Sequence, residues 1–221
     1  MVKKKLKPNQ KKLNNEKNIE WPLVRLGDYC KVLGGYAFKS KDFTKEGILV
    51  VKIGNIQDGT VVIDNRTNYF PKTKITESIK KFILNKGDIL IALTGATTGK
   101  IGLVPQEHEG TLLNQRVGKF DIFNKELDAT FFRFYCLLPE FQDKIKGNIL
   151  KSAQGNISPK QIENIKLYLP PLNKQKDIAE ILATIYENIE KEEKKKLALQ
   201  ELFKSMLNEL MYNKIEVSNN A

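Results

Sequence analysis

The chain has 221 residues, enough for one large domain or for one compact domain with an appendage. Its 37 Lys and Arg outnumber its 26 Asp and Glu, which gives a formal charge of +11. This excess favours a polyanionic partner such as DNA, RNA or an anionic membrane surface. No stretch approaches the roughly 18 consecutive apolar residues that a membrane-spanning helix needs.

The N-terminal region is basic and almost free of apolar residues. Its first 18 residues hold seven lysines and one acid, so we predict a flexible basic arm over residues 1–20. The arm lacks the apolar stretch and the cleavage site of a secretory signal, and we expect none. Cys30 and Cys136 are far apart and have no companions at metal-ligand spacing. This cysteine pattern is typical of buried free thiols in a protein of the reducing cytoplasm.

Residues 21–171 read as short β segments separated by turns, and we predict one domain there. A helical insert is expected at about 128–144, where the apolar stretch is too long for a strand. Strands and helices do not alternate regularly, so we expect an α+β fold with a mixed, mainly antiparallel sheet. The predicted strands lie within the segments 46–56, 60–65, 86–93, 100–105 and 116–123.

Residues 172–213 predict one long helix, with Asn173 as its cap and a short tail at 214–221. Its apolar residues recur in steps of three and four, the pattern of a coiled-coil seam, and Glu192 and Lys196 lie on the same seam. A helix of about 40 residues spans about 60 Å, so it must project from a domain of this size. We expect its first turns to pack on the domain. The residues assigned to helix pairing are Ile181, Leu182, Ile185, Ile189, Leu199, Phe203, Met206 and Leu210.

Catalytic and metal-binding patterns are weak in this sequence. The single histidine, His108, stands in a turn-like stretch without a second histidine or a cysteine to complete a zinc site. Acids such as Asp58, Asp64 and Asp88 occupy turn positions, where Asp is favoured for its backbone hydrogen bonds. We therefore predict no catalytic residue and no metal ligand.

The stretch TGATTGKIG resembles a phosphate-binding loop but departs from its pattern. Three residues instead of four separate Gly95 from Gly99, and Ile101 stands where Ser or Thr would bind magnesium. The following residues read as a strand, whereas a phosphate loop opens a helix. We interpret the stretch as a glycine hairpin that presents Thr97, Thr98 and Lys100 to a partner.

Five segments follow one another in a fixed order: WPLVRLGDYCKVLGGYAF at 21–38, EGILVVKIGNI at 46–56, KGDILIALTGATTGKIGLV at 86–104, LLNQRVGKF at 112–120 and QGNISPKQIENIKLYLPPLNKQKDIAEIL at 154–182. Their order and spacing resemble those of the specificity subunits of type I restriction–modification systems. Together with the long helix the resemblance covers nearly the whole chain. Family members carry two recognition domains and two such helices, whereas this chain has one of each.

The resemblance implies a division of labour between subunits. The recognition domain would read one half of a bipartite site in double-stranded DNA, and the helix would set its distance from a second domain. Methyltransferase (modification) subunits would bring S-adenosylmethionine, and a separate restriction subunit with an ATP-driven motor would cleave. This chain would then need no cofactor, and a half-length chain would pair with a copy of itself through the helix.

For DNA contact we favour polar and basic residues in loops, since amides suit adenine, Arg suits guanine and Lys suits phosphate. Each could instead be a solvated loop residue, and Phe38 could belong to the core. The candidates are Tyr36, Phe38, Lys39, Lys41, Asn55, Gln57, Arg66, Asn68, Thr97, Thr98, Lys100, Gln115, Arg116, Lys151, Gln154 and Asn156.

Two other functions fit the same composition. A basic RNA-binding module with a coiled-coil tail would present stacking aromatic side chains on a sheet face. An interaction protein that competes with a full-length specificity subunit would bind a methyltransferase without reading DNA sequence.

Overall fold

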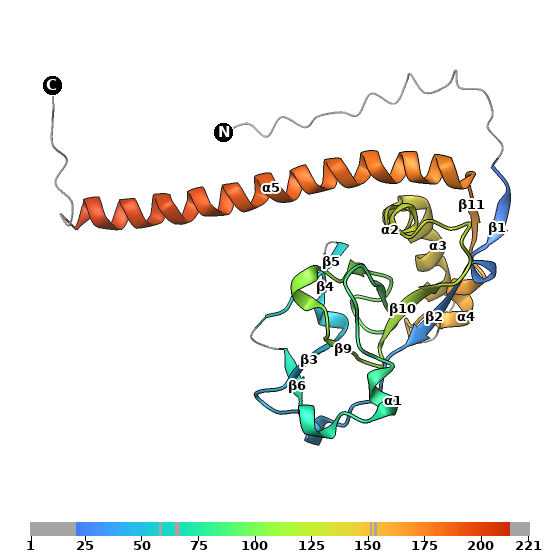
Figure 1. Cartoon of the computed structure of the whole chain (residues 1–221), viewed down its shortest axis with the longest axis horizontal. Helices are drawn as coiled ribbons and strands as arrows, with labels where there is room; N and C mark the ends of the chain where they lie inside the picture. Colours follow the sequence, from blue (N-terminus) through green and yellow to red (C-terminus); the bar gives the residue numbers. More distant parts are fainter. Residues whose placement is uncertain (1–20, 58, 65–66, 151, 153, 213–221) are drawn as a thin grey trace, which may run out of the picture.

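The computed structural model describes residues 21–212, apart from positions 58, 65–66, 151 and 153. It has an α+β domain from which one long helix, α5, runs far beyond the other elements (Figure 1). The α+β expectation is confirmed. The predicted arm at 1–20 and tail at 214–221 lie outside the described residues. Within the described part, no helix combines the length and the hydropathy that crossing a bilayer requires.

The main sheet has six strands and is antiparallel except for the pairing of β5 with β8. Its central strand β7 is buried on both faces because alternate side chains enter different cores. Ile89 and Ile91 pack with Phe132 in one core, whereas Leu90 packs with Val51 in another. The strands in spatial order are β2 (Cys30–Gly34), β10 (Val117–Ile122), β7 (Ile89–Ala92), β8 (Ile101–Leu103), β5 (Gly59–Val61) and β4 (Ile56–Gln57).

A second sheet of three strands lies beside the first. It orders β6 (Asn68–Phe70), β3 (Ile48–Val51) and β9 (Leu112–Leu113), with β3 and β9 parallel. Its core is aromatic, and the rings of Phe38 and Phe70 have centroids 4.9 Å apart. The short helix α1 (Glu77–Lys80) contributes Ile79 to this core and is capped by the hydroxyl of Thr76.

Helices cover one side of the six-stranded sheet. The helical insert expected at 128–144 consists of two helices, α2 (Ala129–Leu137) and α3 (Pro139–Leu150), because the chain turns at Leu138 before Pro139 starts α3. Strands β1 (Leu23–Arg25) and β11 (Lys166–Tyr168) pair antiparallel and bring the two ends of the domain together. Helix α4 (Pro159–Glu163) precedes β11 and carries a Ser158–Gln161 capping box.

Helix α5 (Leu172–Met211) confirms the predicted long helix, but its start differs from the prediction. Pro171 is the cap residue, and the Asn173 side chain accepts from the amide of Lys174 instead of capping the helix. The start is held by Gln175, which is fully buried. Its Oε1 accepts from the Asp128 amide at 2.9 Å, and its Nε2 donates to the carbonyls of Glu126 and Pro170 at 2.8 Å each.

Candidate nucleic-acid interface

Five loops meet at one end of the six-stranded sheet, and we call this surface the loop edge. It comprises residues 34–39, 52–57, 93–100, 114–116 and 152–157 without position 153. Backbone hydrogen bonds join the loops in series: Gln115 to Tyr36 at 2.9 Å, Leu93 to Arg116 at 2.9 Å, Ile157 to Leu93 at 2.9 Å and Asn114 to Val51 at 3.0 Å. The Thr97 hydroxyl donates to the Ile53 carbonyl at 3.1 Å and so ties in the remaining loop.

Among its described residues the loop edge contains no Asp and no Glu; Asp58, which follows Gln57 in the chain, lies outside the described residues. Its polar side chains are amides, hydroxyls and cations, and Lys39, Lys100 and Arg116 are exposed. Glycines leave the backbone open to a partner, since nothing lies within 4 Å of a Cβ built on Gly54 or Gly155. A cationic surface with accessible backbone fits a polyanion.

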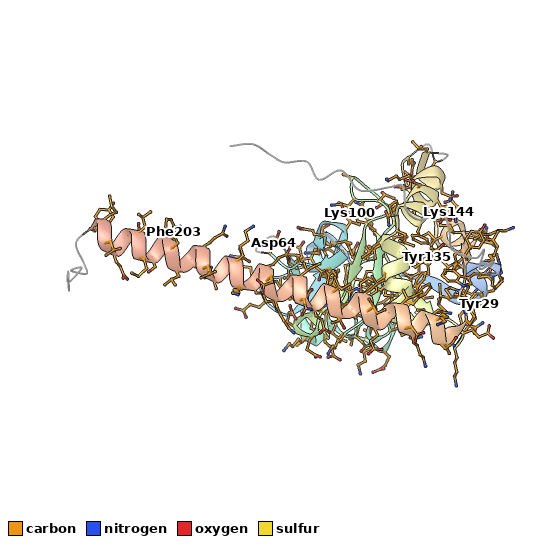
Figure 2. The ribbon with its side chains drawn as sticks, turned by 90° about the horizontal axis from the view of Figure 1, so that it is seen from above. Tyr29, Asp64, Lys100, Tyr135, Lys144 and Phe203 are labelled. Atoms are coloured by element: carbon orange, nitrogen blue, oxygen red, sulfur yellow. The ribbon has the colours of Figure 1, made fainter. Side chains whose placement is uncertain are left out.

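The hairpin prediction for TGATTGKIG is confirmed. Residues 93–100 join the antiparallel strands β7 and β8, so the loop opens a strand and lacks the helix N-terminus of a phosphate loop. Gly95 and Gly99 have φ of +83° and +87°, which few other residues adopt. The Thr98 hydroxyl donates to the Gly95 carbonyl at 2.6 Å and stiffens the turn, and Lys100 is exposed (Figure 2).

A cationic group missed by the sequence analysis lies beside this hairpin. Lys52 Nζ is 4.1 Å from the centroid of the Phe43 ring and donates to the Asn68 Oδ1 atom. Burial lowers the pKa of Lys52. Asn68 is thereby placed next to the loop edge, and Gln57, half-buried, donates to the Gly54 carbonyl at 3.0 Å. The only sequence signal for Lys52 was its place within the predicted strand segment 46–56, directly after the apolar residues 48–51.

Two candidates are withdrawn because the structure gives them internal roles. Phe38 is 8% exposed in the aromatic core, so the core interpretation holds for this residue. Asn55 is 7% exposed. Its Oδ1 accepts from the Lys52 amide at 2.9 Å, and its Nδ2 donates to the Val62 carbonyl at 2.9 Å and to the Thr67 hydroxyl at 3.2 Å. The Asn55 amide is therefore used in shaping the loop.

The remaining candidates that the structure describes lie on or beside the loop edge. Gln115 and Gln154 are exposed, and Asn156 donates to the Gln154 Oε1 atom at 3.3 Å. Tyr36 is half-buried, with its ring centroid 4.9 Å from that of Phe38. Lys41 is exposed in a 3-10 turn that follows the loop edge. Arg66 and Lys151 lie outside the described residues.

His108 and the two cysteines, which the sequence analysis set aside as metal ligands, lie apart from any metal-binding group among the described residues. No group of three or more His, Cys, Asp or Glu within them could hold a metal ion. His108 ends the short 3-10 helix Gln106–His108 at the surface of the domain. Both cysteines are free and buried, and burial raises the pKa of Cys30 to about 12. These thiols therefore stay protonated near neutral pH.

The residues assigned to helix pairing remain exposed along α5. Contact with the domain extends to Tyr186, whose ring lies 4.4 Å from the Arg133 guanidinium and 6.2 Å from the Phe134 ring. Beyond it the helix runs past the domain, and Figure 2 labels Phe203 on this far part. The exposed fractions of these eight side chains are Ile181 62%, Leu182 36%, Ile185 51%, Ile189 50%, Leu199 56%, Phe203 68%, Met206 40% and Leu210 38%, and Leu197, Leu202, Leu207 and Met211 are exposed on the same helix as well.

Curated proteins similar to this chain are specificity subunits. The MjaVIII specificity subunit of Methanocaldococcus jannaschii is 30% identical over 204 residues, which cover 90% of this chain and 47% of that protein. The EcoBI subunit of Escherichia coli is 27% identical over 172 residues, 77% of this chain and 33% of that protein. The chain thus spans half or less of the length of these relatives.

Solved structures share the fold. The type I restriction–modification S subunit from M. genitalium matches with a TM-score of 0.58 at 19% identity, over 87% of this chain and 46% of that one. The HsdS subunit from Thermoanaerobacter tengcongensis matches with a TM-score of 0.54 at 19% identity, over 80% and 40%. The family model of the type I restriction modification DNA specificity domain matches residues 18–201. The chain belongs to the family of type I restriction–modification DNA specificity domains.

Proposed function

We propose that this chain reads one half of a bipartite DNA site for a type I restriction–modification complex. The observation that carries the proposal is the loop edge, whose described residues gather amide, hydroxyl and cationic side chains from five separate loops and include no acid. Such a surface supplies phosphate contacts together with bidentate readers of base edges. An RNA-binding module is less well supported, because Tyr36, the aromatic residue of the loop edge outside the core, is half-buried.

In this proposal the chain is non-catalytic. Methyltransferase subunits supply S-adenosylmethionine, and a restriction subunit supplies the ATP-driven motor. The chain itself needs no cofactor. Co-purification with a methyltransferase subunit, followed by mapping of methylated sites in a host that carries both genes, tests the assignment. Methyltransferase binding without a defined methylated motif would instead identify an interaction protein that does not read DNA.

The proposal includes a homodimer joined through α5. The far part of α5 exposes an apolar seam that is too long to remain solvated. A twofold dimer presents two identical domains in inverted orientation, so its target should be an interrupted palindrome. An asymmetric methylated motif, obtained with no second specificity chain present, would contradict this part.

Phosphate contacts from the loop edge should make DNA binding steeply salt-dependent. Between about 50 and 200 mM salt we expect affinity to fall by orders of magnitude if several phosphates are contacted. Lys100→Ala should weaken binding to all sequences about equally and lower the salt slope by about 1. Lys125→Ala, at an exposed lysine beyond the other end of β10, is the matched control. Equal effects of the two variants in fluorescence anisotropy titrations would contradict the loop-edge assignment.

Gln57 should contribute to base readout, because it lies at the loop edge and its side chain is only half-buried. Gln57→Ala should relax preference at one base pair by about 1–3 kcal/mol if the side chain makes a bidentate contact. Selection from a randomised duplex library, compared between wild type and variant, measures this. An unchanged preference at every position would remove Gln57 from the readers.

A further inference from the structure

The seam of α5 is symmetric about Lys194. Read forwards from Ile178 or backwards from Leu210, it takes the same alternating steps of four and three residues. An antiparallel pair of identical helices aligns each seam position of one with the mirror position of the other. The seam consists of Ile178, Leu182, Ile185, Ile189, Glu192, Lys196, Leu199, Phe203, Met206 and Leu210.

The two charged seam positions select the orientation. In an antiparallel pair centred on Lys194, Glu192 of each copy faces Lys196 of the other, so the interface holds two opposite-charge pairs. A parallel pair would place Glu192 against Glu192 and Lys196 against Lys196, which is repulsive. In the isolated chain Glu192 has only an exposed partner on its own helix, Lys195 at 4.0 Å, a contact of little energy.

The same charges select the register. A shift by one heptad would bury Glu192 against Ile189 in one direction or against Phe203 in the other. Each alternative leaves a charge unpaired among apolar side chains, which is costly. In the centred register the overlap of the two helices ends where α5 itself ends. Met211, the last residue of α5, lies opposite Asp177 of the other copy, and the buried Gln175 lies just outside the overlap.

An apolar pocket of about 720 Å³ lies where the seam meets the domain. It opens between β1, β11, α2 and the first turns of α5, and Figure 1 shows α2 directly beside that part of the helix. Seam residues Ile178 and Leu182 form one wall. The facing walls include Trp21, Leu23, Phe134 and Tyr168, of which Leu23 is 51% exposed and Tyr168 48% exposed.

We propose that the end of α5 from a second copy occupies this pocket in the register centred on Lys194. This inference rests on the proposed homodimer. Met206 of the second copy then lies opposite Leu182, and its Leu210 lies opposite Ile178. Both side chains reach the pocket walls of the recognition domain. Each domain is thereby clamped between its own helix and its partner's, which fixes the separation of the two half-site readers.

Disulfide trapping tests the register, because a bridge needs Cα atoms about 4.4–6.8 Å apart. The full chain carrying Leu182→Cys and Met206→Cys should form a covalent dimer on mild oxidation. Leu182→Cys with Leu199→Cys bridges only in a register shifted by one heptad, and Leu199→Cys alone only in a parallel pair. Native Cys30 and Cys136 are buried, and wild type provides the baseline. The register is overturned if a dimer cross-links through either control variant, or if neither the test pair nor the controls cross-link.

A charge at the pocket tests its occupancy. Leu23→Glu should raise the dimer dissociation constant at least about tenfold in analytical ultracentrifugation. Phe123→Glu, at a side chain 54% exposed outside the pocket, is the matched control and should leave it unchanged. Circular dichroism melting checks the fold, and Tyr168→Glu replaces Leu23→Glu if the latter unfolds.

These outcomes separate the pocket from the dimer itself. A dimer with the expected cross-links that tolerates both pocket variants overturns the pocket. A monomeric wild type instead overturns the proposed homodimer, and loss of half-site recognition by a folded chain overturns the DNA-reading function.

Discussion

Replacing both Leu199 and Phe203 with glutamate should leave the chain monomeric. The two side chains are 56% and 68% exposed on α5, and in the centred register they face Ile189 and Ile185 of the second copy. Burial of a Leu or Phe contributes about 1.5–3 kcal/mol, and twofold symmetry repeats each contact. The dissociation constant should therefore rise at least about 1,000-fold, which light scattering across a dilution series measures.

Two single variants, one on the seam and one off it, test whether the dimer depends on the seam or on any exposed apolar side chain of α5. Leu197 is 60% exposed, as exposed as Leu199, but it lies off the seam on the same helix. Leu197→Glu should leave the dimer intact, whereas Leu199→Glu should weaken it. Equal weakening by the two would show that another face of α5 is buried. The monomeric variant should keep its affinity for a half-site and lose the avidity gain, about 100-fold or more, on a palindrome.

Gln175→Leu should destabilise the domain by about 3–5 kcal/mol, a large part of the 5–15 kcal/mol typical of a folded protein. Leucine has a similar volume, but it leaves the buried carbonyl of Pro170 and the partly buried Asp128 amide and Glu126 carbonyl without the partners that Gln175 provides. Because these groups join α5 to the loop before α2, the helix should also lose its fixed direction. Chemical denaturation followed by circular dichroism gives the free energy of unfolding.

The control for Gln175 is Gln200→Leu, at an exposed glutamine on the same helix. Both substitutions are made in the monomeric Leu199→Glu, Phe203→Glu background, so that dimer dissociation does not contribute to the measured stability. Gln200→Leu should change the free energy of unfolding by less than about 0.5 kcal/mol. If Gln175→Leu lowers the free energy of unfolding by less than about 1 kcal/mol, water replaces the amide. Gln175 then does not anchor the start of α5.

The sequence alone determined the long helix and the residues of its seam. Helical periodicity is local, and from Leu172 to Met211 neither proline nor glycine interrupts it. The residue at which the helix starts could not be predicted from the local sequence. Asn173 has the residue type of a cap, yet the start is held by Gln175 through its hydrogen bonds to Glu126, Asp128 and Pro170. The seam symmetry about Lys194 was also present in the sequence, but its meeting with an apolar pocket required the packed domain.

The sequence also determined five of the described strands, β3, β5, β7, β8 and β10, and the glycine hairpin at 93–100, because alternating burial and turn residues are short-range signals. Strand pairing was decided by tertiary structure. The parallel pairs β3·β9 and β5·β8 join segments far apart in the chain, and no local pattern specifies such partners. These pairings bring five loops to one edge and so turn scattered polar residues into one surface.

Within the loop edge, only side-chain packing distinguishes the residues that are free to contact DNA bases from those that shape the loops. Asn55 and Gln57 stand two residues apart and carry the same amide group, yet Asn55 is 7% exposed and fully bonded inside its loop, whereas Gln57 remains half-buried at the rim. Phe38 and Tyr36 differ in burial in the same way: Phe38 is buried because the surrounding rings form a core with it, whereas Tyr36 is half-buried. A side chain's chemistry can be read from sequence, but the direction in which it points depends on backbone geometry and neighbours that distant segments supply.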